Sequence, residues 1–98
     1  MFKERWSKRA LNDFDEIIEF ILTKWTAKEA LAYIEKVERI ISQIRKTPEM
    51  FVQSIKGKDI RKCVINKQTS LFYRINGQII EIITIISNKQ NPKKQIIS

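Results

Sequence analysis

Apolar residues in the first half of the chain recur every three to four positions, which is the spacing of one face of an α-helix. Before them, residues 2–6 (FKERW) alternate apolar and charged positions and predict a short strand. Ser7 offers a hydroxyl that can cap a helix N-terminus, so we expect the first helix to begin there. The predicted buried stripe of this helix consists of Leu11, Phe14, Ile17, Ile18, Ile21, Leu22 and Trp25.

A second helix is predicted directly after the first. In the sequence TAKE, Thr26 and Glu29 form a capping box, in which the threonine hydroxyl accepts a hydrogen bond from the backbone N–H of Glu29. Pro48 makes continuation of the helix past Thr47 unfavourable. The buried stripe of this helix is predicted to be Ala30, Leu31, Ile34, Val37, Ile41 and Ile44. Because the two helices adjoin without a linker, we expect an antiparallel helical hairpin.

The period then changes from 3.6 to 2, which is typical of strands. Residues 49–58 are predicted to be a loop, and residues 59–66, 69–75 and 78–86 are predicted strands. Asn76-Gly77 is a strong signal for a two-residue type I′ turn. This turn would place Ile75 opposite Gln78, Tyr73 opposite Ile80 and Leu71 opposite Ile82. The face for the helices would then carry Leu71, Tyr73, Ile75, Ile80, Ile82 and Ile86, and the other face Ser70, Phe72, Arg74, Ile79, Glu81, Ile83 and Ile85.

These elements predict an α+β fold with the order β-α-α-β-β-β, in which the helical hairpin packs on one face of an antiparallel sheet. The length of 98 residues favours a single domain, residues 1–98, that ends in a basic tail, residues 87–98. The second face of the sheet is half apolar, so we expect a partner or the tail of the chain to cover it.

The positive charge is concentrated in the second half of the chain. The net charge is +8; residues 1–50 hold ten Lys and Arg against nine Asp and Glu, whereas residues 51–98 hold nine against two. This asymmetry indicates an acidic or polyanionic partner, although a basic surface that serves only solubility is the alternative.

The N-terminus resembles no signal peptide, and the longest apolar run, residues 79–86, is too short to span a bilayer. We therefore expect a cytoplasmic protein without membrane contact.

The residue types also limit the chemistry of the chain. It contains one cysteine, Cys63, and no histidine. This composition excludes the usual zinc sites, a histidine general base and any Ser-His or Cys-His nucleophile pair. We expect no cofactor and no metal.

Four stretches together resemble the RelE/ParE superfamily of toxins from type II toxin–antitoxin systems. They are WSKRALNDFDEIIEFI (6–21), ALAYIEKVERIISQIRKTPE (30–49), DIRKCVI (59–65) and LFYRINGQIIEIITI (71–85), followed by NKQNP (88–92). The resemblance implies a bacterial toxin that is silenced by a co-expressed antitoxin, a segment of which wraps over the toxin. It also implies one of two targets: RelE-like members cut mRNA in the ribosomal A site, and ParE-like members poison DNA gyrase.

The chain matches only some of the catalytic residues that the resemblance to RelE-type nucleases implies. Arg61 and Lys89 fit positions at which that set has basic residues, and these two would be the catalytic candidates in a nuclease. Cys63 stands where a lysine is expected, Ser70 stands where an arginine would bind the scissile phosphate, and the tail has neither Tyr nor His. The resemblance therefore favours a ParE-like toxin that is not an enzyme. A ribosome-dependent endoribonuclease is the alternative, followed by an inactive homologue or a basic nucleic-acid-binding domain.

The candidate residues for binding the target or the antitoxin are Arg61, Phe72, Arg74, Lys89, Lys93 and Lys94. We expect them to form a cationic, partly apolar saddle on the open face of the sheet, in which antitoxin binding buries Phe72 and the region of Arg61 and Arg74. Simpler interpretations remain: Arg74 can form a surface ion pair with Glu81, and Lys93 and Lys94 can be solvated. For Trp6 and Trp25, packing in the core or at its rim is the expected role.

Overall fold

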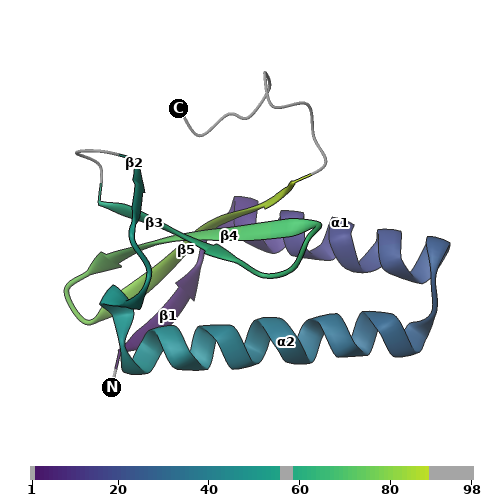
Figure 1. Ribbon diagram of the computed structural model, residues 1–98, viewed down its shortest axis with the longest axis horizontal. Coiled ribbons are helices and arrows are strands. Elements are labelled where there is room, and N and C mark those ends of the chain that lie inside the picture. Colours follow the sequence, from purple (N-terminus) through teal and green to yellow (C-terminus); the bar gives the residue numbers. More distant parts are fainter. Residues whose placement is uncertain (1, 56–58, 89–98) are drawn as a thin grey trace.

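The computed structural model describes residues 2–55 and 59–88 and confirms the predicted α+β fold (Figure 1). Lys93, Lys94 and Lys89 lie outside the described residues, as does nearly all of the predicted basic tail. The elements in chain order are β1 (Lys3–Trp6), α1 (Lys8–Lys24), α2 (Ala27–Lys46), the 3-10 turn η1 (Pro48–Met50), β2 (Gln53–Ile55), β3 (Ile60–Val64), β4 (Thr69–Asn76) and β5 (Ile79–Ser87).

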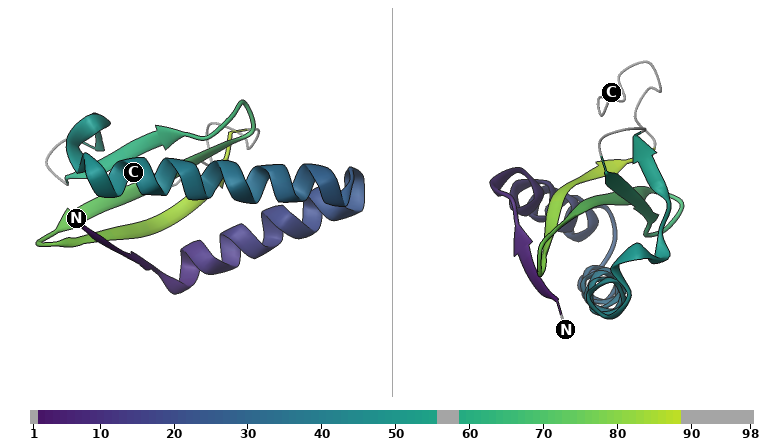
Figure 2. Two further views of the ribbon diagram at one scale, coloured as in Figure 1. Left: turned by 90° about the horizontal axis from the view of Figure 1, so that it is seen from below. Right: turned by 90° about the vertical axis from the view of Figure 1, so that its left-hand side faces the viewer.

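Both helices begin at the caps that the sequence predicts. The Ser7 hydroxyl accepts a hydrogen bond from the N–H of Ala10 at 2.9 Å, and the Thr26 hydroxyl accepts one from the N–H of Glu29 at 3.1 Å. Each cap satisfies a backbone donor that has no partner within its helix. Figure 2 shows α2 beneath the sheet and α1 beside its β1–β5 side. In the described parts of the chain, neither helix combines the length and the apolar character that crossing a bilayer requires.

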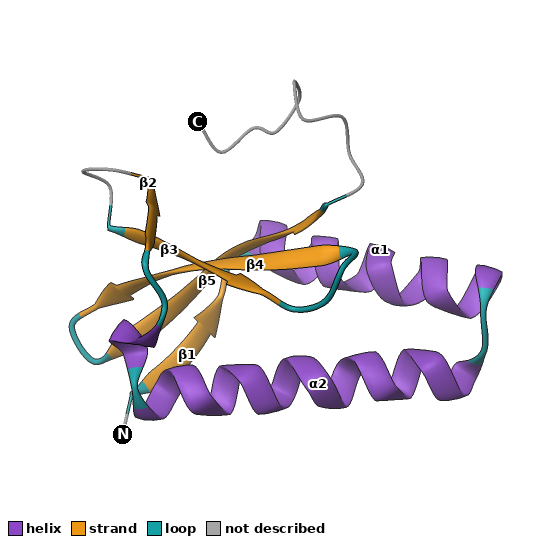
Figure 3. Ribbon diagram, in the orientation of Figure 1, coloured by secondary structure: helices purple, strands orange, loops and turns teal. Residues whose placement is uncertain are grey.

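The sheet has five strands in the order β1-β5-β4-β3-β2, coloured orange in Figure 3. It is mixed: β1 pairs with β5 in parallel, and all other pairs are antiparallel. The prediction of a purely antiparallel sheet was therefore wrong for β1, because the apolar pattern of a strand does not encode its direction. The short strand β2 lies in a region that was predicted to be a loop.

The register of the β4–β5 hairpin also differs from the prediction. The turn residues are Gly77 and Gln78, so that Asn76 lies opposite Ile79 and Ile75 lies opposite Ile80. Gly77 adopts a φ of 62°, in the left-handed region that favours glycine. The pairing is shifted by two residues from the predicted one, and a shift of two keeps every side chain on its face. For this reason the hydrophobic pattern could not distinguish the two registers.

A bulge near the middle of β5 changes the faces of the residues that follow it. Phe72 lies opposite Thr84 and Tyr73 lies opposite Ile82, so Ile83 has no partner on β4. Beyond this extra residue the alternation is inverted. Ile85, which is 3% exposed, therefore joins the core on the helix side in place of the predicted Ile86.

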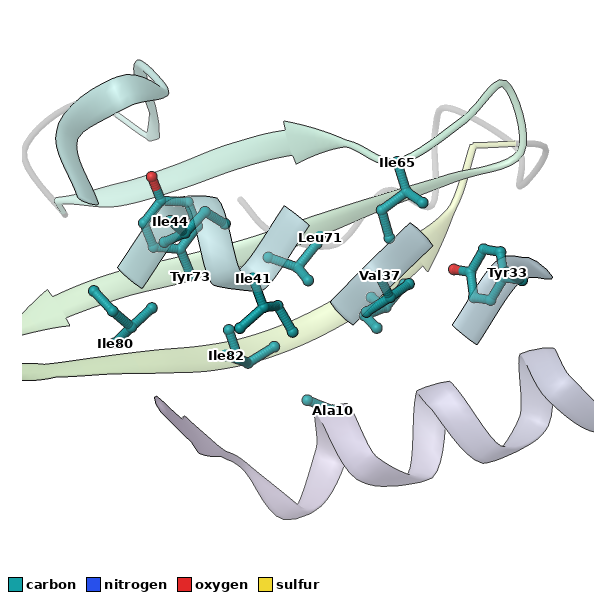
Figure 4. Close-up of a cluster of buried hydrophobic side chains, with 11 residues drawn as sticks. Ala10, Tyr33, Val37, Ile41, Ile44, Ile65, Leu71, Tyr73, Ile80 and Ile82 are labelled. Carbon is teal, nitrogen blue, oxygen red and sulfur yellow. The ribbon is translucent and has the colours of Figure 1, made fainter. Parts of the chain in front are cut away.

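The core lies between α2 and the sheet. Its buried members are Ala10, Tyr33, Val37, Ile41, Ile44, Ile65, Leu71, Tyr73, Ile80, Ile82 and Ile85 (Figure 4). The two tyrosines bring hydroxyls into this apolar layer, and both hydroxyls have partners. Tyr73 donates to the carbonyl of Pro48 at 2.6 Å, and Tyr33 lies 2.9 Å from the hydroxyl of Thr69. These bonds attach η1 to the middle of β4 and α2 to its first residue.

Candidate functional site

Charged residues of three neighbouring strands form a ladder across the face of the sheet that α2 leaves uncovered. Glu81 on β5 pairs with Arg74 on β4 and with Arg5 on β1. Its carboxylate accepts a hydrogen bond from Arg74 Nε at 2.9 Å and lies 3.5 Å from Arg5 Nη1. The hydrogen bond from Arg74 is the main reason why the pKa of Glu81 lies below its usual value. The ladder keeps one net positive charge, and both arginine side chains are more than half exposed.

The ion pair between Arg74 and Glu81 confirms one of the two interpretations of Arg74. The two residues lie directly opposite each other, whereas the register predicted from the sequence would have placed Arg74 opposite Ile79. It does not remove Arg74 from consideration as a contact residue, since an exposed ion pair stabilises the fold by only about 0–1 kcal/mol. A partner carboxylate can approach the guanidinium groups of Arg74 and Arg5 from solvent.

Phe72 lies on the same face as Arg74 but does not present an open aromatic surface. The side chain is 7% exposed, and the Nζ of Lys62 on β3 lies 6.0 Å from the centre of its ring. The expectation that Phe72 lies exposed for a partner to cover was therefore wrong. Lys62 itself is exposed and adds a positive charge next to the ladder.

Arg61 lies on the opposite face of the sheet from Arg74. It pairs with Tyr73, whose side chain is in the core. One guanidinium nitrogen donates to the carbonyl of Phe51 at 2.6 Å, and the other terminal nitrogen lies 3.9 Å from the carboxylate of Asp59. The Nε atom is buried without a hydrogen-bond partner among the described residues. The saddle that was predicted to combine Arg61 with Arg74 does not exist, because the two arginines project from different faces.

Burial raises the pKa of two further groups near Arg61. The pKa of Tyr73 rises to about 12 and that of the Cys63 thiol rises to about 11, in both cases chiefly because burial penalises the charged form. A group with such a pKa is protonated at neutral pH and cannot act as a general base there. Within residues 2–55 and 59–88, no cluster of three or more His, Cys, Asp or Glu side chains could hold a metal ion.

Ser70 occupies the position at which a nuclease of the superfamily would carry an arginine, and it is buried. Its hydroxyl donates to the side-chain oxygen of Asn88 at 2.9 Å. Asn88 in turn donates from its backbone N–H to the carbonyl of Gln68 at 2.5 Å. Ser70 therefore contributes to fixing the end of β5 against the turn between β3 and β4.

A groove that the sequence analysis did not identify lies between α1, α2 and the end of β5. Its volume is about 830 Å³, and Ile17, Phe20 and Trp25 contribute apolar surface to it. Phe20 is 57% exposed and Trp25 is 67% exposed, so α1 carries apolar surface beyond the stripe that faces the core. The sequence signal for this groove was Phe20, an aromatic residue of α1 that lies outside the predicted stripe. The expectation that Trp25 packs in the core or at its rim was wrong: its side chain is 67% exposed, and it borders this groove at the end of α1.

Known proteins resemble this chain in their fold. Among curated protein sequences, none matches it. Among solved structures, a chain described as the chromosomal ParDE toxin–antitoxin system from P. aeruginosa is similar, with 17% identity, a TM-score of 0.75, and coverage of 89% of this chain and 96% of that one. A YoeB/ParE toxin from Agrobacterium tumefaciens has 20% identity, a TM-score of 0.64, and coverage of 87% and 97%. At this identity, both similarities concern the fold.

A copper-bound mutant toxin from Helicobacter pylori shares the fold as well, with 21% identity, a TM-score of 0.64, and coverage of 90% of this chain and 96% of that one. The family model described as the ParE toxin of type II toxin–antitoxin systems, parDE, matches residues 5–92. This match covers most of the chain, from β1 past the end of β5. The chain therefore belongs to the ParE toxin family of type II toxin–antitoxin systems, within the RelE/ParE superfamily.

Proposed function

We propose that this chain is a growth-inhibiting toxin that acts in the cytoplasm by binding its target, DNA gyrase, and that a cognate antitoxin neutralises it. Membership of the ParE toxin family supports the toxin role. The resemblance to ParE-like members supports gyrase as the target. A binding inhibitor needs a complementary surface and no arrangement of groups for proton transfer.

The observation that carries the choice of binding over RNA cleavage is the environment of Arg61. Cleavage at a 2′-hydroxyl requires cations that stabilise the charge of the phosphorane and groups that move protons. Arg61 is the one nuclease candidate of the sequence analysis that lies within the described residues. Its guanidinium donates to the Phe51 carbonyl on the core face of the sheet, and its side chain is only 14% exposed, which leaves little of it for a phosphate to contact. Lys89 lies outside the described residues and does not bear on this choice.

The antitoxin contact in this proposal is the ladder of Arg5, Glu81 and Arg74. Because the ladder has a net positive charge and exposed guanidinium groups, an acidic segment of the antitoxin can form bidentate ion pairs on it. Lys62 next to the ladder extends the positive surface. A short reading frame directly adjacent to the toxin gene, encoding an acidic or amphipathic protein, would be the source of this partner.

The test is induced expression of the chain without a partner, with the 5′ ends of transcripts mapped in the arrested cells. We expect growth arrest with intact transcripts, and inhibition of DNA supercoiling when the purified chain is added to gyrase. Cuts inside translated codons would instead establish the ribosome-dependent nuclease, and Lys89 would then be the residue to mutate. Growth without arrest would identify the chain as an inactive homologue.

A further inference from the structure

Four cations lie on one face of the sheet, and α2 covers the other face (Figure 2). Arg5 and Arg74 belong to the ladder, and Lys62 lies next to it. Lys3 precedes Arg5 by two residues on β1, so it lies on the same face, where it pairs with Ile79. All four side chains are exposed. We call these four residues the cationic stripe.

The pairing of the strands arranges the cationic stripe along a diagonal of the sheet. Lys3 is on the edge strand β1, and Lys62 is three strands away on β3. Arg5 and Arg74 share one row across the strands, because both pair with Glu81. Lys3 lies two residues to one side of this row and Lys62 two residues to the other side. With strands about 4.8 Å apart and about 6.7 Å between alternate residues, the diagonal is about 20 Å long.

Little negative charge opposes the cationic stripe on its own face. The described strands contain two acidic residues, Glu4 and Glu81. Glu81 faces the stripe within the ladder. Glu4 neighbours Arg5 in sequence and therefore lies on the opposite face, where its carboxylate is 3.7 Å from Nη1 of Arg45. Four cations and one acid give the open face of these strands a net charge of +3.

We propose that the cationic stripe binds the phosphate backbone of duplex DNA. This site deepens the function proposed above and rests on it, since duplex DNA is the substrate of gyrase: with the chain bound to the enzyme, the stripe would contact the DNA that gyrase holds. Each strand of a duplex carries one phosphate per about 3.4 Å of helix axis, so a stripe of about 20 Å runs along about six phosphates of one strand. Its four side chains thus find phosphates along their whole length.

The surroundings of the cationic stripe favour a duplex over a single strand. Proteins bind single strands largely through aromatic side chains on which successive bases stack. Phe72 is the aromatic residue of the described strands on this face, and it is 7% exposed, with the Nζ of Lys62 at 6.0 Å from its ring centre. No base can stack on a ring that is covered in this way. A contact confined to phosphates suits a duplex, in which the bases are already stacked on one another.

The composition of the face favours DNA over a protein surface as the main occupant. The centre of a protein–protein interface is depleted of charged residues, and lysine is depleted in such interfaces generally. Interfaces with DNA are more polar and much more positively charged. The middle of this face is the ion pair of Arg74 with Glu81, flanked by lysines. An acidic antitoxin segment offers charge of the same sign as DNA, so antitoxin and DNA would compete for the stripe.

The test measures binding of the full chain to a fluorescent duplex DNA of mixed sequence by anisotropy over a range of salt concentrations. Neutralisation of three phosphates gives a slope of about −2.7 in a plot of the logarithm of the binding constant against the logarithm of the salt concentration. We therefore expect the affinity to fall about 40-fold between about 50 mM and about 200 mM salt. A slope near zero, or no binding at the lowest salt concentration, would overturn the proposal.

Two double variants with the same charge change distinguish the cationic stripe from the general positive charge of the chain. Lys62→Gln with Arg74→Gln removes half of the stripe and should make the slope shallower by about 1.8. Lys28→Gln with Arg39→Gln removes two exposed cations of α2, beneath the other face, and should change the slope by less than about 0.5. Equal effects of the two pairs would contradict a specific contact at the stripe.

A gain of binding provides a measurement that loss of folding cannot imitate. Glu81→Gln removes the acid from the face, so it should tighten binding and make the slope steeper by about 0.9. Unchanged or weaker binding would count against the stripe. Single-stranded DNA and duplex RNA of the same length are the comparison ligands. Tighter binding of either one than of duplex DNA would overturn the choice of ligand.

Supercoiling assays in parallel separate this proposal from the proposed function, because the anisotropy measurement contains no gyrase. Inhibition of gyrase by a parent chain that does not bind DNA through the stripe would support the proposed function and overturn the stripe. Binding of DNA through Lys62 and Arg74 without inhibition of supercoiling would support the stripe as a DNA site and contradict gyrase as the target.

Discussion

The carboxylate of Asp13 on α1 accepts a hydrogen bond from the hydroxyl of Thr84 on β5, with 2.5 Å between the two oxygens. The same carboxylate oxygen accepts from the backbone N–H of Ile85 at 3.2 Å. β1 pairs with β5 only as far as Ile82, so the edge of β5 is open from there on. Ser7 donates its hydroxyl to the carbonyl of Ile83 at 2.7 Å on the same edge. The start of α1 thus provides the hydrogen bonds that a longer β1 would otherwise provide.

Replacement of Asp13 by alanine should destabilise the fold. It leaves the hydroxyl of Thr84, which is 1% exposed, and the N–H of Ile85 without their partner. An unsatisfied buried polar group costs about 1–3 kcal/mol, and we expect a loss in this range in the free energy of unfolding, measured by urea denaturation. Asp15→Ala is the control, since Asp15 is exposed on the same helix and should change stability by less than about 0.5 kcal/mol. Equal losses in the two variants would show that Asp13 does not anchor α1.

Replacement of Arg61 by methionine should reduce stability and not only activity. The substitution removes the donor to the Phe51 carbonyl, and hydrogen bonds to charged groups contribute about 1.5–3 kcal/mol. Arg74→Met is the matched control: its ion pair is half exposed, so we expect a loss of about 0–1 kcal/mol. Denaturation curves of both variants provide the comparison. If Arg61→Met kept the stability of the parent chain yet abolished growth inhibition, Arg61 would be a contact to the target and the argument against a nuclease would fail.

Replacement of Arg74 by glutamate should weaken antitoxin binding if the antitoxin covers the ladder. The substitution places two acids opposite each other on β4 and β5 and reverses the net charge of the ladder. We expect the dissociation constant, measured by calorimetry, to rise about tenfold, which corresponds to about 1.4 kcal/mol. The effect should shrink as salt is added, because screening weakens contacts between exposed charges. Arg39→Glu makes the same charge change on the exposed side of α2, and an equal loss of affinity there would indicate general charge attraction and no specific contact.

Gly77 allows a direct test of the observed turn. Its φ of 62° is unfavourable for residues with a Cβ, although no atom lies within 4 Å of the place where that Cβ would be. Gly77→Ala should therefore cost about 1–2 kcal/mol through backbone conformation alone. Gly77→Asn should cost less, since asparagine tolerates the left-handed region. Gly77 would also be in the turn in the register predicted from the sequence, so the loss of unfolding free energy alone does not distinguish the two registers. Cross-strand amide contacts between Asn76 and Ile79 distinguish them, because these residues lie opposite each other only in the observed register.

The parts of the fold that the sequence predicts well are those with a local cause. Ser7 and Thr26 cap helices through contacts three residues away, and both helices begin where these caps require. The register of the hairpin has no such cause, because a shift by two residues leaves the same isoleucines in the core. At the bulge, the carbonyl of Ile83 accepts a hydrogen bond from Ser7, which is remote in sequence. Alternation alone could not locate it.

The candidate site was less predictable because the alternation of apolar and polar residues along β3 does not show which face of this strand is buried. Ile60, Lys62 and Val64 point to one face and Arg61, Cys63 and Ile65 to the other, so each set combines apolar and basic side chains. In the structure the set with Arg61 faces the core, where Arg61 donates to the carbonyl of Phe51, and Phe51 is ten residues away in sequence. The alternation along β3 does not show this contact. Arg74 was placed correctly, since its strand has one clearly apolar face.

Stability should depend on Glu81 at neutral pH but not in acid. Its folded pKa lies below the ordinary value of 4.5, mainly because of the hydrogen bond from Arg74, so the folded chain favours the charged carboxylate. A carboxyl group with a depressed pKa contributes stability above its unfolded pKa, and this contribution is lost as the pH falls through the folded pKa. The difference in unfolding free energy between the parent chain and Glu81→Gln should therefore be constant from about pH 7 to about pH 5 and decrease at lower pH.

Urea denaturation at each pH measures this difference. Glu35→Gln on the exposed side of α2 is the control, and its difference from the parent chain should stay below about 0.5 kcal/mol throughout. A difference for Glu81→Gln that does not change with pH would mean that the ladder contributes no charge-dependent stability. The guanidinium groups of Arg5 and Arg74 would then not be held by Glu81 in solution. The ordered cationic surface on which the antitoxin contact rests would lose its physical basis.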